Sequence, residues 1–116
     1  MLIVDDDDAF RGLALRILRS SGFDVVGEAA TSASGMAAAL ELRPDAMLVD
    51  IRLPDGSGVD LARAFVRLAW TPRVLLTSSD IDAAGEIGAS SDRWPLAFVA
   101  KDQLPNAPLT ILLAGP

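Results

Sequence analysis

Acidic residues gather at two places in the sequence, and each group directly follows a short apolar run. Asp5 and Asp6 come after Leu-Ile-Val at 2–4, and Asp50 comes after Ala-Met-Leu-Val at 46–49. Clustered carboxylates repel one another and remain ionised together more easily when a cation is present. Hard oxygen ligands suit Mg²⁺, with Mn²⁺ as an alternative. If these acids meet in the fold, the sequence predicts a divalent-cation site.

Asp50 is also a candidate nucleophile, because a carboxylate can accept a phosphoryl group and form an aspartyl phosphate. Such a transfer depends mainly on positioning and on the neutralisation of charge. Nine of the ten basic residues are arginine, and the single lysine is Lys101. Its compact ammonium would supply positive charge beside a phosphate. Thr77 would donate its hydroxyl hydrogen to a phosphoryl oxygen, and Ser78 follows it with a second hydroxyl.

Each of these residues also has an ordinary structural explanation. Asp50 could cap the loop that follows it, Thr77 could be a β-branched strand residue, and Lys101 could be a solvated surface lysine. Asp7 and Asp8 are explained as a solvated acidic turn that caps the next helix. These explanations stay open for each residue alone, although one shared site accounts for them together.

Short apolar runs alternate with amphipathic stretches, which predicts the frame that must position these side chains. We expect strands at 2–4, 24–28, 46–50, 73–77 and 97–100, and helices at 9–20, 32–42, 59–69 and 104–113, with Thr31 or Ser32 as a cap. The same pattern predicts a turn-rich loop at 53–58 and one short helix near 82–87.

Five strands alternating with about five helices predict an α/β fold with a doubly wound, five-stranded parallel sheet and helices on both faces. Ligands of such sheets bind beyond the carboxyl ends of the strands. The candidate residues named above follow the apolar runs at those ends. The predicted fold would therefore bring them to one edge.

Length and composition restrict the function classes. The 116 residues, 51% of them hydrophobic, fit one domain over 1–116 with its own core. A net charge of −6 argues against direct nucleic-acid binding. The absence of histidine and cysteine excludes histidine catalysis, thiolate metal sites and disulfides within this chain. No apolar run approaches the roughly 20 residues that span a membrane, and no signal peptide is evident, so we expect a cytoplasmic protein.

Taken together, the residues resemble the receiver domain of two-component response regulators, from Leu2 to about Leu113. The resemblance is carried by Leu-Ile-Val-Asp-Asp at 2–6, Leu-Val-Asp-Ile-Arg-Leu-Pro-Asp-Gly-Ser-Gly at 48–58, Leu-Leu-Thr-Ser at 75–78 and Phe-Val-Ala-Lys at 98–101. The second motif is the most specific. The resemblance implies the flavodoxin-like strand order 2-1-3-4-5. We expect no output domain in this chain.

The resemblance also implies roles for the acidic residues. Asp50 is similar to the phosphoacceptor of receiver domains. Asp5 and Asp6 are similar to the acidic pair that holds Mg²⁺ together with Asp50, and the backbone carbonyl of Arg52 corresponds to a further ligand.

Further roles follow for the residues around the phosphate. Thr77 resembles the switch hydroxyl, Lys101 the phosphate-pairing lysine, and Phe98 the aromatic residue that rotates in the switch. Arg52 and Ser79 occupy positions that in receivers commonly tune the attack of water on the phosphoryl group.

A receiver domain is a regulatory phosphoacceptor rather than an enzyme acting on an external substrate, although it assists its own phosphotransfer and dephosphorylation. The resemblance implies a sensor histidine kinase as the donor and a downstream protein or output domain as the partner. The absence of histidine agrees with a donor histidine on another protein. Receivers often pair as homodimers, and the sequence leaves that state open.

Two other functions stay open. Asp5-Asp6-Asp7 contains the acid-any-acid spacing of haloacid-dehalogenase phosphatases, but Asp5 would then be the nucleophile and the motif after Asp50 would have no explanation. The second alternative is a degenerate receiver that only binds a partner.

One departure from the family is Asp102, which follows Lys101 where many receivers have a proline in a cis bond.

Overall fold

The computed structural model describes residues 1–79 and 96–114. Its centre is a five-stranded parallel sheet in the order β2-β1-β3-β6-β7. The strands are β1 Leu2–Val4, β2 Gly27–Ala29, β3 Ala46–Asp50, β6 Arg73–Ser78 and β7 Leu96–Ala100. A separate hairpin pairs β4 Arg52–Leu53 with β5 Gly56–Ser57. Without this hairpin the order is 2-1-3-4-5, which confirms the expected fold.

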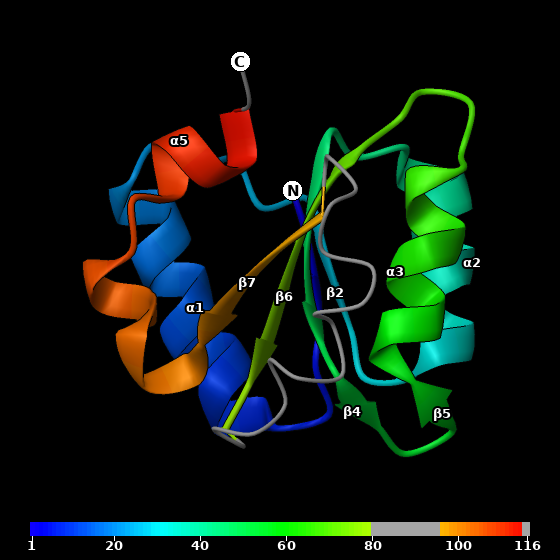
Figure 1. The fold of residues 1–116 in the computed structure, drawn as a ribbon, viewed down its shortest axis with the longest axis horizontal. Helices are drawn as coiled ribbons and strands as arrows, with labels where there is room; N and C mark the ends of the chain where they lie inside the picture. The colour runs from blue at the N-terminus through cyan, green and yellow to red at the C-terminus, as the bar shows by residue number, and fades with distance from the viewer. Residues whose placement is uncertain (80–95, 115–116) are drawn as a thin grey trace.

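Helices cover both faces of the sheet (Figure 1). The described helices are α1 Asp8–Ser20, α2 Ser32–Leu42, α3 Gly58–Val66 and α5 Leu109–Ala114, with the 3₁₀ helix η1 Lys101–Asn106. Figure 1 places α1 and α5 on one side of the sheet and α2 and α3 on the other. Of the helices that the structure describes, none has both the length and the apolar character that crossing a bilayer requires.

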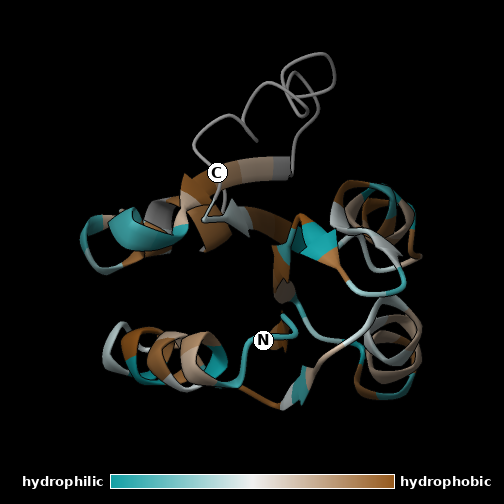
Figure 2. Ribbon diagram, turned by 90° about the horizontal axis from the view of Figure 1, so that it is seen from below, coloured by the Kyte–Doolittle hydropathy of each residue, from teal (hydrophilic) through white to brown (hydrophobic). Residues whose placement is uncertain are grey.

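A hydrophobic cluster lies on each face, because successive strand residues point to opposite sides. Leu2 and Val4 of β1 join the α2–α3 cluster with the fully buried Phe65. Ile3, between them, joins the α1–α5 cluster with Phe10. Strands β1 and β3 are buried on both faces, as their continuous apolar runs predict. In Figure 2 the strands of this middle layer are mostly hydrophobic.

The first two helices start where the sequence provides a cap. The Asp7 carboxylate accepts hydrogen bonds from the backbone N–H groups of Ala9 and Phe10, which confirms the capping role expected in this acidic turn. Thr31 and Ser34 form a capping box at the start of α2, with each side chain accepting from the other residue's backbone N–H. These local contacts explain why α2 has the predicted bounds.

Two expectations in the first half of the chain were wrong in detail. The strand expected at 24–28 is β2 at 27–29. Helix α1 ends at Ser20 as expected, but the turn after it continues to Phe23: Gly22 has a φ of 93° and the Phe23 N–H donates to the Leu18 carbonyl. The loop expected at 53–58 instead contains the β4–β5 hairpin, with Pro54 and Asp55 between its strands.

Two further differences lie later in the chain, and proline explains the second. Helix α3 ends at Val66 rather than at residue 69, and the chain then turns through Thr71, with a φ of 48°, into Pro72. The helix expected at 104–113 is divided into η1 and α5. Ala107, just before Pro108, is extended with φ −73° and ψ 145°, as a residue preceding proline prefers. The helix expected near 82–87 lies outside the described residues.

Candidate functional site

Parallel pairing aligns the carboxyl ends of the central strands at one edge of the sheet. Asp50 at the end of β3 pairs in register with Thr77 of β6, and Ser78 pairs with Ala100 of β7. Lys101 follows Ala100 directly and begins η1. Each polar side chain therefore leaves the sheet where its apolar strand ends.

Three carboxylates meet at this edge. Asp5, Asp6 and Asp50 each offer an oxygen, and these oxygens lie within 4.8 Å of one another. Asp5 is 1% exposed and Asp50 is 6% exposed, whereas Asp6 faces solvent. The cluster thus has two buried walls and one open side, which would let a hydrated cation enter and keep some of its waters.

Lys101 joins two of these carboxylates. Its Nζ lies 2.9 Å from Asp5 Oδ2 and 3.4 Å from Asp50 Oδ2, and the lysine side chain is 15% exposed. The explanation of Lys101 as a solvated surface lysine is therefore wrong. Its ammonium lies in the acidic cluster, although Lys101 is far from both acids in the sequence.

The pKa values of Asp50 and Lys101 are both raised at this edge. Burial raises the pKa of Asp50, the neighbouring charge of Asp5 raises it further, and Lys101 and the Arg52 backbone N–H act in the opposite direction. For Lys101, burial disfavours the ammonium, but the hydrogen bond to Asp5 and the charges of Asp50 and Asp5 outweigh it and raise its pKa. The cluster has more negative charge than one lysine neutralises, which favours an additional cation.

Two buried hydroxyl residues end β6, beside the end of β3. Thr77 is 0% exposed and Ser78 is 2% exposed. Within residues 1–79 and 96–114, the Thr77 Oγ1 has no hydrogen-bond partner. A buried hydroxyl without a partner costs free energy. An oxygen-rich ligand at the sheet edge would therefore find a donor ready at Thr77.

The backbone after β3 fixes the position of Asp50. The Arg52 N–H donates to Asp50 Oδ1 at 3.2 Å, and the Ile51 N–H donates to the Thr77 carbonyl at 2.9 Å. Gly58 packs so closely that an added Cβ would lie 1.8 Å from the Asp50 carbonyl oxygen. Only a residue without a side chain fits there.

The remaining predicted residues surround this core of the site. Arg52 and Ser79 have exposed side chains at the rim, one at the start of β4 and one directly after β6. Phe98 pairs with Leu76 in register and packs, partly buried, against the α2–α3 cluster. Phe98 therefore lies in the apolar packing, on the strand that leads directly into Lys101.

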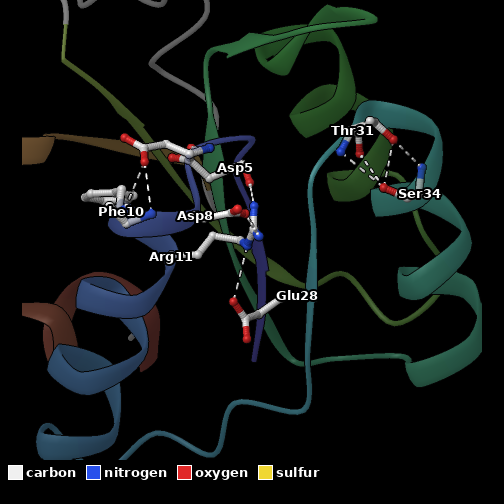
Figure 3. A network of polar contacts seen from close by, with 9 residues as sticks. Asp5, Asp8, Phe10, Arg11, Glu28, Thr31 and Ser34 are labelled. Carbon is white, nitrogen blue, oxygen red and sulfur yellow. Dashed lines mark hydrogen bonds and ion pairs between the residues drawn. The ribbon is translucent and has the colours of Figure 1, made fainter.

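Arg11 is a site residue that the sequence interpretation missed. Its guanidinium donates to the Asp5 backbone carbonyl at 2.5 Å and forms ion pairs with Asp8 and Glu28 (Figure 3). It thereby ties α1 to the ends of β1 and β2. Its position five residues after Asp6, on the helix that follows the acidic run, was the available signal.

Phe10 was also missed. The Lys101 ammonium lies 4.4 Å from the centroid of its ring, which is a cation–π distance. Periodicity assigns Phe10 to the core face of α1, and it is indeed in the α1–α5 cluster. Nothing in the sequence indicates that a residue 91 positions later would lie over its ring.

An acidic cluster paired with a lysine lies at the carboxyl edge of a doubly wound sheet, which is where ligands of such sheets bind. Comparison with known families agrees: the model of the response regulator receiver domain matches residues 1–92. The chain therefore belongs to the response regulator receiver domain family. The matched range includes Asp5, Asp50 and Thr77, while Lys101 lies beyond it and is placed by the geometry above.

Individual relatives give the same picture. A protein-glutamate methylesterase/protein-glutamine glutaminase of Alkalilimnicola ehrlichii is 34% identical over 86% of this chain and 26% of its own length. The DNA-binding response regulator MtrA of Mycolicibacterium smegmatis is 36% identical over 67% of this chain and 34% of its own length. The chain thus spans about a quarter to a third of the length of these relatives.

Solved structures resemble the whole described fold. A putative response regulator from Chloroflexus aurantiacus has a TM-score of 0.78 and 25% identity, covering 98% of this chain and 96% of its own. The response regulator domain of Thermotoga maritima CheB has a TM-score of 0.72 and 25% identity, covering 90% and 87%. Both similarities agree with the strand order and the helical layers described above.

Proposed function

We propose that this chain is a phosphorylation-driven switch whose phosphoacceptor is Asp50. The observation that carries the proposal is the grouping of Asp50 with Asp5, Asp6 and Lys101 next to the Thr77 hydroxyl, which has no hydrogen-bond partner among the described residues. The donor would be a phosphohistidine of a sensor kinase.

In the proposed transfer, a carboxylate oxygen of Asp50 attacks phosphorus. The bond between phosphorus and the histidine nitrogen of the kinase breaks, and the nitrogen keeps the electron pair. Lys101 pairs with a phosphoryl oxygen, and Thr77 donates its hydroxyl hydrogen to another. These groups neutralise charge and fix geometry, which is most of what phosphoryl transfer requires.

The acidic cluster fits a divalent cation, because its donors are hard oxygens and its net charge exceeds what Lys101 offsets. Asp5, Asp6 and Asp50, with the backbone carbonyl of Arg52, would hold Mg²⁺ or Mn²⁺. When bound, the ion would neutralise negative charge on the phosphoryl oxygens.

The state of Asp50 would be passed on through the strands beside it. In the proposed switch, Thr77 moves toward the phosphoryl group and Phe98 shifts in its packing, so that the phosphoryl group biases an existing equilibrium. Ser78 lies beside Thr77 as a further phosphate contact. Arg52 and Ser79, exposed at the rim, would tune the attack of water and so the lifetime of the phosphoryl group.

We further propose that residues 1–116 act as one regulatory receiver domain in the cytoplasm. The phosphorylated state would be recognised by a downstream protein or an output domain, with homodimer formation as one route. The relatives named above carry long segments outside the matched region, in agreement with such a division of labour.

Phosphorylation of the purified protein tests the function. With Mg²⁺ and a small phosphodonor such as acetyl phosphate, intact mass should show one added phosphoryl group, and ¹⁹F NMR should detect bound beryllofluoride. Asp50→Asn should lose both signals. Asp45→Asn, which changes an exposed acid just before β3, should keep them.

Three results would contradict the proposal. Equal labelling of the wild type and Asp50→Asn would exclude Asp50 as the acceptor. Turnover of a phosphate ester that is lost in Asp5→Asn but kept in Asp50→Asn would support the haloacid-dehalogenase phosphatase instead. Failure of the wild type to bind Mg²⁺ would support a degenerate receiver.

A further inference from the structure

We propose that Phe10 is a positioning residue for Lys101: its aromatic face holds the ammonium at the phosphoryl-accepting edge through a cation–π contact. The inference rests on the proposed function, because it assigns Phe10 a role in that reaction. The contact itself is geometric: the Lys101 Nζ lies 4.4 Å from the ring centroid. Such contacts are strongest where water is excluded, and the lysine side chain is 15% exposed.

The ring of Phe10 is buried and held on both sides. Phe10 is 7% exposed and lies in the first turn of α1, where its backbone N–H donates to the capping carboxylate of Asp7. Its side chain belongs to the same buried cluster as Leu104 of η1, the helix that begins at Lys101. The ring therefore has support both from its own helix and from the segment that carries the lysine.

The ring differs in kind from the other two groups that hold the ammonium. Asp5 and Asp50 lie 2.9 Å and 3.4 Å from Nζ, but both belong to the cluster that takes part in the proposed chemistry. When Asp50 becomes an acyl phosphate, its carboxylate no longer offers the same charge. The face of Phe10 is unchanged by cation binding and by phosphoryl transfer. It can keep the flexible lysine in place while the ammonium exchanges its carboxylate partners.

A spectroscopic measurement tests the contact without any phosphorylation. Because Lys101 is the only lysine, a sample labelled with ¹³C-lysine gives a single set of side-chain resonances. The ring current should shift the ε-methylene protons upfield in the wild type, and Phe10→Leu should return them to the values of a free lysine. Wild-type resonances already at free-lysine values would overturn the proposal.

The rate of phosphorylation by acetyl phosphate then tests the role. Phe10→Leu and pentafluorophenylalanine at position 10 should each lower the rate about three- to tenfold, whereas Phe10→Tyr should retain it. Pentafluorophenylalanine keeps the shape of the ring but reverses its quadrupole, so it separates the cation–π contact from packing. Phe65→Leu removes a fully buried ring in the opposite cluster and should leave the rate unchanged.

A double-mutant cycle with Lys101→Met distinguishes the possible failures. The effect of Phe10→Leu should disappear when the lysine is absent. If the wild type is phosphorylated and the pentafluoro variant reacts at the wild-type rate, the role of Phe10 is overturned and the proposed function stands. If the wild type takes up no phosphoryl group, the proposed function fails and the kinetic role fails with it, while the lysine resonances still report whether the contact exists.

Discussion

Two aspartates of the 48–58 motif, Asp50 and Asp55, lie five residues apart and have opposite environments. Asp50 is buried at the end of β3, and burial together with the charge of Asp5 raises its pKa. Asp55 is exposed between β4 and β5 and accepts hydrogen bonds from the backbone N–H groups of Ser32 and Ala33 at the start of α2. These bonds lower the pKa of Asp55.

The difference separates an acid kept for chemistry from an acid kept for structure. The ionised Asp55 stabilises the fold, because it satisfies two N–H groups at the positive end of a helix. The ionised Asp50 is unfavourable in the absence of a cation, and only Lys101 and a backbone N–H oppose that cost. One motif thus supplies both a reactive carboxylate and a contact that anchors the hairpin following it.

The largest expected effect comes from a substitution that disturbs the surroundings of Asp50 and leaves those of Asp55 intact. Gly58→Ala would place a Cβ 1.8 Å from the Asp50 carbonyl oxygen, so the backbone of β3 or α3 must move. We expect a loss of about 3 kcal/mol in the free energy of unfolding, together with loss of Mg²⁺ binding. Urea denaturation and Mg²⁺ titration measure these two quantities.

Gly12→Ala provides the matched control for that substitution. Gly12 lies inside α1, and an added Cβ there meets nothing within 4 Å. Alanine should therefore stabilise the helix by up to about 1 kcal/mol. Equal losses in the two variants would show that Gly58 has no special relation to Asp50.

A smaller effect of opposite sign is expected for Asp50→Asn in Mg²⁺-free buffer. Because the pKa of Asp50 is higher in the folded state than in the unfolded state, its stabilising contribution is present at low pH and is lost as the pH rises through the folded pKa. The amide does not ionise, so the variant should exceed the wild type in Tm at neutral pH. The excess should shrink in acid.

Mg²⁺ should reverse that order. The cation binds the folded wild type and should raise its Tm, whereas Asp50→Asn should respond weakly. Thermal melts with EDTA and with excess Mg²⁺ measure both states. A wild type that is more stable than the variant without Mg²⁺ would contradict the electrostatic account.

The smallest effect is expected for Asp55→Ala, which removes the contact to α2 but leaves Asp50 in place. The pKa of Asp55 is lower in the folded state, so its contribution is present above the unfolded pKa and is lost as the pH falls through the folded pKa. The variant should be slightly less stable at neutral pH and should match the wild type in strong acid. Its phosphorylation rate should be unchanged.

Asp45→Ala is the control for this change, because Asp45 has an exposed side chain and precedes β3 rather than a helix. Denaturation series from neutral to acid pH compare the two variants. A pH-independent loss in Asp55→Ala would show that its charge does not stabilise α2.

The gathering of the site could be predicted because each candidate follows an apolar run that forms a parallel strand. Asp5 and Asp50 meet Lys101 as expected, and the register places Thr77 opposite Asp50. The packing partners could not be predicted in this way. The close approach of Gly58 to Asp50 and the contact of the Phe10 ring with Lys101 depend on how α3, α1 and η1 pack against the strands.

Element bounds show the same division. The limits of α2 were predicted correctly because the Thr31 cap and the following pattern are local signals. The division of the last helix was missed, although Pro108 is visible in the sequence. Proline is tolerated in the first turn of a helix, and the sequence does not show at which residue the helix begins.

By itself, the sequence determined the fold class and the edge at which the chemistry lies, because burial requires apolar runs and parallel strands end together. The strand order followed from the resemblance to receiver domains. Only the tertiary structure decided the electrostatic character of that edge. Lys101 lies between Asp5 and Asp50 and over Phe10 because residues that are far apart in the sequence pack side by side. The energies of these charges depend on distance and burial, which the sequence does not contain.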